Sequence, residues 1–210
     1  MLKLSAPETR QSSAKALKMV YYVIVGLAIT EALHRTFLKD GSFLGLQAFT
    51  LNNLTRTILL FALLLTVCRF VHGASIHLDM ISEKRYKTLY DFIGFFMQAS
   101  LFYLMAVSLE KPIVFSSLFG IMLLFDAFWL IFLRMGNYIE LDGTAKQWLW
   151  SDFCIVGALF VIYLTDTTMA CICSVVVIFI VALAATFLDY FLNKNFYFPI
   201  SKSATLSSTV

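Results

Sequence analysis

Long, uninterrupted apolar stretches constrain this chain more than any other feature. The run Pro112–Leu133, PIVFSSLFGIMLLFDAFWLIFL, holds a single charged residue, Asp126. A helix needs about 20 apolar residues to cross the hydrocarbon core of a bilayer, and this run lacks the period of two that a membrane β-barrel requires. Only 14% of the 210 residues are charged, against about 25% in soluble domains. The sequence therefore predicts an all-α, polytopic transmembrane helical bundle.

Hydropathy divides the chain into six predicted spans with a polar segment at each end. Residues 1–16 and 193–210 are expected to be N-terminal and C-terminal tails, and residues 17–192 to form the transmembrane helical domain. The expected spans are Leu17–Phe37, Arg56–Ile76, Thr88–Ser108, Pro112–Leu133, Trp148–Thr165 and Thr168–Tyr190. We therefore expect a multi-pass protein of the cell membrane or an inner membrane.

The distribution of lysine and arginine predicts the orientation, because cytoplasmic loops carry an excess of these residues. With the amino terminus inside, eleven of the 16 Lys and Arg residues lie on the cytoplasmic side and four on the other side, while Arg69 lies within a span. We therefore expect both termini in the cytoplasm.

Arg69 and His72 interrupt the second span in the stretch LLLTVCRFVHGASIHLDM. Their spacing of three places them on one helix face, and a charge at this depth costs roughly 2.5–3.5 kcal/mol unless it finds a partner or reaches the headgroups. Asp126 of the fourth span lies at nearly the same predicted depth, so we expect an Arg69–Asp126 ion pair. His72 is predicted to line a water-accessible vestibule and to respond to pH. The alternative is a neutral histidine bonded to a backbone carbonyl.

Further polar residues fall in the same cytoplasmic half. Asp91 begins the third span with Gln98 further along it, and Asp152 and Asp189 lie near the cytoplasmic ends of the fifth and sixth spans. Their common side with Arg69 predicts a polar vestibule that faces the cytoplasm. For Gln98, a structural amide that holds helices together is the alternative.

The outer half has its own polar cluster, Glu31, His34 and Arg35, in the stretch AITEALHRTF. Glu31 and Arg35 are four residues apart, the spacing at which opposite charges on one helix neutralise each other. A structural role is therefore the favoured interpretation of this cluster.

We predict no catalytic residue, no metal site and no cofactor. The three histidines of the chain are too few for a di-iron site and lack the His-Glu-x-x-His spacing that binds zinc. Neither a Gly-x-Ser-x-Gly elbow, a phosphate-binding glycine loop nor a Cys-x-x-Cys pair occurs. Anchoring at the inner leaflet accounts for the net charge of +3, so nucleic acid is not expected as a partner.

Three interpretations of function follow. The preferred one is a small channel or transporter with the polar vestibule on its cytoplasmic side. The second is a non-catalytic membrane sensor or the membrane-embedded subunit of a larger complex. The third is an enzyme that acts on a lipid-phase substrate through His72 or Asp126. The lipid bilayer is the expected partner, and helix glycines such as Gly94 and Gly120 favour a homo-oligomer or membrane complex, because they permit close helix contacts.

Overall fold

The structure is a computed structural model that describes residues 6–39, 42–81, 88–135, 143–165 and 172–198. Six helices in these ranges are long and apolar enough to cross a membrane, which confirms the predicted helical membrane bundle. These helices are α1 (Ala6–Phe37), α2 (Leu51–Ile81), α3 (Thr88–Val107), α4 (Pro112–Met135), α5 (Gly143–Thr165) and α6 (Ile172–Leu192).

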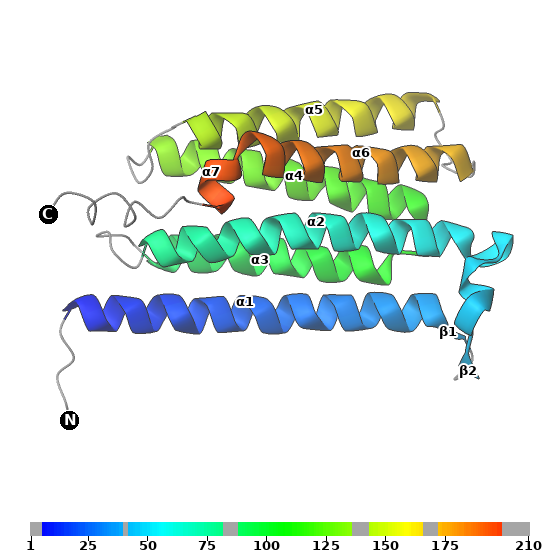
Figure 1. The fold of residues 1–210 in the computed structure, drawn as a ribbon, viewed down its shortest axis with the longest axis horizontal. Coiled ribbons are helices and arrows are strands. Elements are labelled where there is room, and N and C mark those ends of the chain that lie inside the picture. The colour runs from blue at the N-terminus through cyan, green and yellow to red at the C-terminus, as the bar shows by residue number, and fades with distance from the viewer. Residues whose placement is uncertain (1–5, 40–41, 82–87, 136–142, 166–171, 199–210) are drawn as a thin grey trace, which may run out of the picture.

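The six long helices form a ring whose order differs from the order of the chain. Helix α1 packs against α2 and α3, α3 packs against α4, α4 against α5, α5 against α6, and α6 against α2. Helix α2 also contacts α3 across the ring. Helices that follow one another along the chain run in opposite directions, and the start of α1 lies at the same end of the bundle as the short helix α7 (Lys194–Tyr197) (Figure 1). We call this the terminal end; it is the end that the charge distribution predicts to be cytoplasmic.

Short elements complete the two ends of the bundle. At the end opposite the termini, the strands β1 (Leu38–Lys39) and β2 (Ser42–Phe43) pair as an antiparallel ribbon. A 3₁₀ helix, η1 (Gly45–Phe49), follows, and Gly45 has a φ of 54°, a conformation that glycine adopts without steric cost. At the terminal end, the short helix α7 (Lys194–Tyr197) folds back toward α2 and α6.

Several helices extend beyond the predicted spans. Helix α1 begins at Ala6, inside the stretch 1–16 that the sequence assigned to a tail, and α7 lies within the predicted C-terminal tail. Helix α2 begins at Leu51, five residues before the predicted start at Arg56. Hydropathy locates only the part of a helix inside the hydrocarbon, whereas backbone hydrogen bonding carries a helix past the membrane surface.

Large apolar side chains fill the half of the bundle opposite the terminal end. Fully buried residues there come from α2, α3 and α4, and include Leu59, Leu63, Phe102, Met105 and Phe115. The interior of this half is therefore closed by close packing. The buried charged groups, Arg69, Asp91, Asp152 and Asp189, lie in the other half.

Candidate functional site

Each of the six long helices contributes one polar side chain to a single cluster inside the terminal half of the bundle. We call this cluster the central network. Its members, in chain order, are Tyr21, Arg69, Gln98, Asp126, Asp152 and Asp189. Buried polar groups require hydrogen-bond partners, and here the partners come from different helices.

Arg69 joins α2 to α5 and α6. Its Nη2 donates to Asp152 Oδ1 at 2.9 Å, and its Nε donates to Asp189 Oδ2 at 3.1 Å. Arg69 is 5% exposed, Asp152 0% and Asp189 3%, so all three charges are inside the protein. The expected Arg69–Asp126 ion pair is therefore wrong: the partners of Arg69 come from the two helices that follow α4.

Asp189 is the best-satisfied carboxylate of the central network. Its Oδ1 accepts hydrogen bonds from Trp148 Nε1 and Asn193 Nδ2, both at 2.7 Å, and its Oδ2 accepts one from Tyr197 Oη at 2.7 Å in addition to that from Arg69. Three neutral donors and one cation satisfy both oxygens of this carboxyl group. Asp189 thus fixes α7 and the start of α5 to α6.

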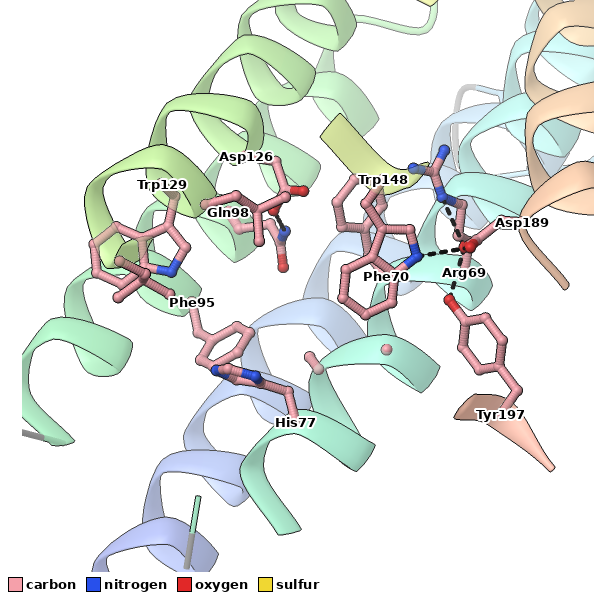
Figure 2. Close-up of a pocket in the computed structure, with 14 residues that line it drawn as sticks. Arg69, Phe70, His77, Phe95, Gln98, Asp126, Trp129, Trp148, Asp189 and Tyr197 are labelled. Atoms are coloured by element: carbon pink, nitrogen blue, oxygen red, sulfur yellow. Dashed lines mark hydrogen bonds and ion pairs between the residues drawn. The ribbon is translucent and has the colours of Figure 1, made fainter. Parts of the chain in front are cut away.

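Asp126 has different surroundings. Its Oδ1 accepts a hydrogen bond of 3.3 Å from Gln98 Nε2, and Gln98 Oε1 accepts one of 2.8 Å from Tyr21 Oη. The Asp126 carboxyl also lies within hydrogen-bonding reach of Asp152. Figure 2 shows Asp126 beside Gln98 and Trp129, whereas Asp189 lies with Arg69 and Tyr197.

The central network holds more acids than bases. Three carboxyl groups and one guanidinium meet inside the bundle, and Asp152 Oδ2 has no hydrogen-bond partner among the described residues. With every carboxyl ionised the cluster would carry a formal charge of −2, which is costly in a medium of low dielectric constant. A proton on Asp126 would reduce this charge and could donate to Asp152.

A cavity of about 80 Å³ adjoins the central network. Arg69, Gln98, Asp126 and Asp189 contribute to its polar wall, and the aromatic rings around it are those of Phe70, Phe95, Trp129, Trp148 and Tyr197. His77 and Leu133, near the ends of α2 and α4, line it toward the terminal end. The cavity has space for a few water molecules, and its polar groups give such waters partners.

His72 lies outside this cavity lining. Its Nδ1 is 3.0 Å from Tyr190 Oη, and its ring packs against those of Tyr190, Tyr197 and Phe198. The histidine that lines the cavity is His77. The contact that the structure describes for the His72 ring nitrogen is with a tyrosine hydroxyl, whereas the neutral alternative expected a backbone carbonyl.

Asp91 is buried near the start of α3 but belongs to a separate pair. Its Oδ1 is 3.5 Å from His77 Nε2, and neither of its carboxylate oxygens has a hydrogen-bond partner in the described part of the chain. The structure therefore brings together three of the five polar residues predicted inside the membrane, Arg69, Gln98 and Asp126. The other two lie outside the central network, Asp91 beside His77 and His72 beside Tyr190.

The outer cluster forms the helix pair that its spacing predicts. Arg35 Nε donates to Glu31 Oε1 at 2.6 Å, and Arg56 Nη2 lies 3.3 Å from Glu110 Oε1 nearby. The His34 side chain is exposed on the same helix. These pairs are partly exposed, which limits their contribution to about 1 kcal/mol or less.

Sequence reasoning did not identify Tyr21 and Tyr197 as members of the site. Neither tyrosine is among the charged, histidine and amide residues from which the site was predicted, and Tyr197 belongs to the segment 193–210 that was predicted to be a tail. The signal in the sequence was the depth of the polar residues: one polar group per span, at similar distances from the terminal end, is the pattern that a central network requires.

No family model, no curated protein and no solved structure matches this chain. Among the residues that the structure describes, no group of three or more His, Cys, Asp or Glu side chains is arranged to hold a metal ion. The central network and its cavity are therefore the candidate functional site of the protein.

Proposed function

We propose that this integral membrane protein is a small proton-coupled transporter, in which Asp126 binds and releases the proton. The observation that carries the proposal is the excess of carboxyl groups over cations beside a cavity in the terminal half of the bundle. Ionisable residues inside a membrane bundle mark proton and substrate pathways more often than they serve packing alone.

The surroundings of the three carboxyl groups favour Asp126 as the proton site. Asp189 accepts four hydrogen bonds, and Asp152 is paired with Arg69. Asp126 has one neutral donor, at 3.3 Å, and lines the cavity. Water in the cavity could therefore exchange a proton with Asp126, while the other two carboxyl groups are bound to Arg69.

Close packing of the opposite half favours a transporter over an open channel. Leu59, Leu63, Phe102 and Phe115 are fully buried there, so a solute in the cavity meets closely packed apolar side chains on its way to the other side. Transport would require a second conformation in which the bundle opens to that side, as in alternating access. In this account the structure represents the conformation that faces the terminal end.

The second candidate is a non-catalytic membrane module. It is favoured by the fact that the central network includes a side chain from every one of the six long helices, since interhelical hydrogen bonds also serve to hold bundles together. On that account the carboxyl groups would bind no exchangeable proton.

A pH-jump experiment separates the two candidates. Proteoliposomes adsorbed on a solid-supported membrane give a transient current when protons bind within the protein, and no solute needs to be known. We expect a transient with native protein, its loss in Asp126→Asn, and its retention in Glu31→Gln, whose carboxylate lies outside the central network. A native protein without a transient, or an unchanged transient in Asp126→Asn, would contradict the proposal in favour of the membrane module.

A further inference from the structure

We infer that the cavity beside Asp126 binds a small organic cation, a protonated or quaternary amine, which exchanges there for a proton. This inference rests on the proposed transport function and names the class of solute. It is carried by the combination of aromatic walls, limited volume and a carboxyl group, Asp126, that has no ion pair among the described residues.

The walls of the cavity present aromatic rings on opposite sides. Phe95 and Trp129 lie on one side, and Phe70 and Trp148 lie on the other, with Asp126 and Gln98 between them (Figure 2). Cations are attracted to aromatic faces within about 6 Å, by roughly 0.5–2 kcal/mol for each favourable contact. A site of aromatic rings beside a carboxylate that is not already paired with Arg69 is suited to an alkylated ammonium group, which is too weakly hydrated to need a full set of hydrogen-bond acceptors.

The charge of the cavity selects a cation over an anion. Arg69 is directed to Asp152 and Asp189 through its Nη2 and Nε atoms, so its charge is already matched by two carboxylates. An anion in the cavity would meet a net negative wall, whereas a monovalent cation beside ionised Asp126 replaces the charge of the proton that it displaces.

The volume of the cavity restricts the solute to a compact head group. About 80 Å³ is available, which accommodates a few non-hydrogen atoms at the packing density of protein interiors. Gly73 and Ala74 line the cavity and leave this space open because their side chains are absent or small. Substituents on the amine could extend past His77 toward the terminal end.

Exchange follows from the sharing of one carboxyl group. The free cation displaces the proton of the Asp126 carboxyl, so that the bound state holds an ammonium–carboxylate pair and one proton enters the water. Binding therefore releases a proton, and the affinity for the cation should rise as the pH rises. This mutual exclusion is the requirement for exchange of a cation against a proton across the membrane.

Calorimetry with purified protein in detergent tests this inference with tetramethylammonium as the probe. The uncharged molecule of similar size and shape, tert-butanol, is the matched ligand control. We expect tetramethylammonium to bind with proton release, and tert-butanol not to bind. Phe95→Leu should weaken binding about tenfold because the aromatic face is lost, and Phe95→Tyr should retain it. Phe92→Leu, on the exposed face of α3, should bind as the native protein does.

Each outcome bears on one proposal. Equal binding of tert-butanol, no binding of tetramethylammonium, or native affinity in Phe95→Leu would overturn the cation site, while a pH-jump transient in the same preparation would leave the proton-coupled function standing. Binding of tetramethylammonium by a protein that gives no transient would support the cation site and contradict the proton-coupled function. Size-exclusion elution of Phe95→Leu and Phe95→Tyr shows whether a loss of binding reflects a loss of folding.

Discussion

At the scale of residues, Arg69 and Asp126 have opposite roles in the central network although both are charged groups inside the bundle. Arg69 is the cation for two carboxylates, and removing one partner of a buried ion pair costs about 3–5 kcal/mol. Asp126 has no ion pair among the described residues, and its hydrogen-bonding neighbours are Gln98 and Asp152. The two side chains should therefore respond differently to substitution.

We expect Arg69→Met to lower the free energy of unfolding by about 3–5 kcal/mol, because Asp152 and Asp189 would remain buried without their cation. Asp126→Asn should cost about 1 kcal/mol or less, since an amide N–H can donate to Asp152 as a protonated carboxyl would. Unfolding of the purified variants in detergent measures both values. A loss in Asp126→Asn as large as that in Arg69→Met would show that Asp126 is ionised and paired.

Tyr197 gives a prediction with a defined pH range. Burial, together with the negative charge of Asp189, raises the pKa of the Tyr197 phenol above its ordinary value of 10.0. The native state thus keeps a proton that the unfolded state loses, so the contribution of Tyr197 to stability is complete below about pH 10 and falls as the pH rises further.

Tyr197→Phe should accordingly be less stable than the native protein by about 1–2 kcal/mol near neutral pH, since Asp189 loses one donor. The difference should shrink above about pH 10. Denaturation of both proteins over a series of pH values provides the measurement. A difference that grows in alkali would mean that the phenolate, and not the phenol, is the stabilising form.

The sequence identified Arg69, Gln98 and Asp126 as interior polar residues because their depth in the spans is readable from hydropathy. It did not identify the partners of Arg69, because pairing depends on which helices are neighbours. Asp152 and Asp189 belong to the same half, near the cytoplasmic ends of their spans, and at such positions hydropathy does not distinguish a buried side chain from one that contacts water. The packing of α5 and α6 against α2 removes both side chains from water.

At the scale of elements, the contact between α3 and α4 depends on the absence of a side chain at Gly94. A Cβ atom there would lie 2.7 Å from Trp129 Cε2 and 2.9 Å from Cζ2. The Trp129 ring is stacked with Phe125 and Phe132, so it has little freedom to move. Gly94 consequently permits Trp129 to form one wall of the cavity.

Gly94→Ala should lower stability by about 1–3 kcal/mol through overpacking, reduced by the better helix propensity of alanine. Gly26→Ala is the matched control in α1, because no atom beyond the adjacent residues and the surrounding turns of the α1 backbone lies within 4 Å of a Cβ at that position. The control should be neutral or more stable by up to about 1 kcal/mol. Thermal unfolding of the pair in detergent checks the prediction, which fails if both variants gain stability.

The six spans were readable from sequence because each needs a long apolar run, whereas helix ends were not. The start of α1 at Ala6 and the helix α7 both lie in polar stretches. There, local hydrogen bonding and contacts such as Tyr197 with Asp189 decide the structure. Such contacts join residues whose spatial proximity the chain order does not reveal.

At the scale of the whole molecule, the ring order of the helices is the property that sequence reasoning could not supply. Helix α1 packs against α3 as well as α2, and α2 packs against α6. Apolar helices in lipid are not ordered by a hydrophobic force between them, so small differences in packing and the polar contacts decide which neighbours they take. The central network is the product of that order.

The orientation in the membrane remains a prediction of the charge distribution. The described residues form an even number of candidate spans, and α1 starts at the end of the bundle where α7 lies. Both ends of the described chain are therefore expected on the same side of the membrane. We expect reporter fusions after Lys111 to report the outside and fusions after Val210 to report the cytoplasm. The reverse pattern would place the cavity on the outer side of the membrane.

The central claim is that Asp126 holds an exchangeable proton, and difference infrared spectroscopy tests it most directly. Protonated and ionised carboxyl groups absorb at distinct frequencies, and deuterium exchange through the cavity shifts the protonated band. We predict that the native protein near neutral pH shows such a band, that Glu31→Gln retains it, and that Asp126→Asn lacks it. A native protein without a protonated carboxyl band, or an unchanged band in Asp126→Asn, would contradict the account.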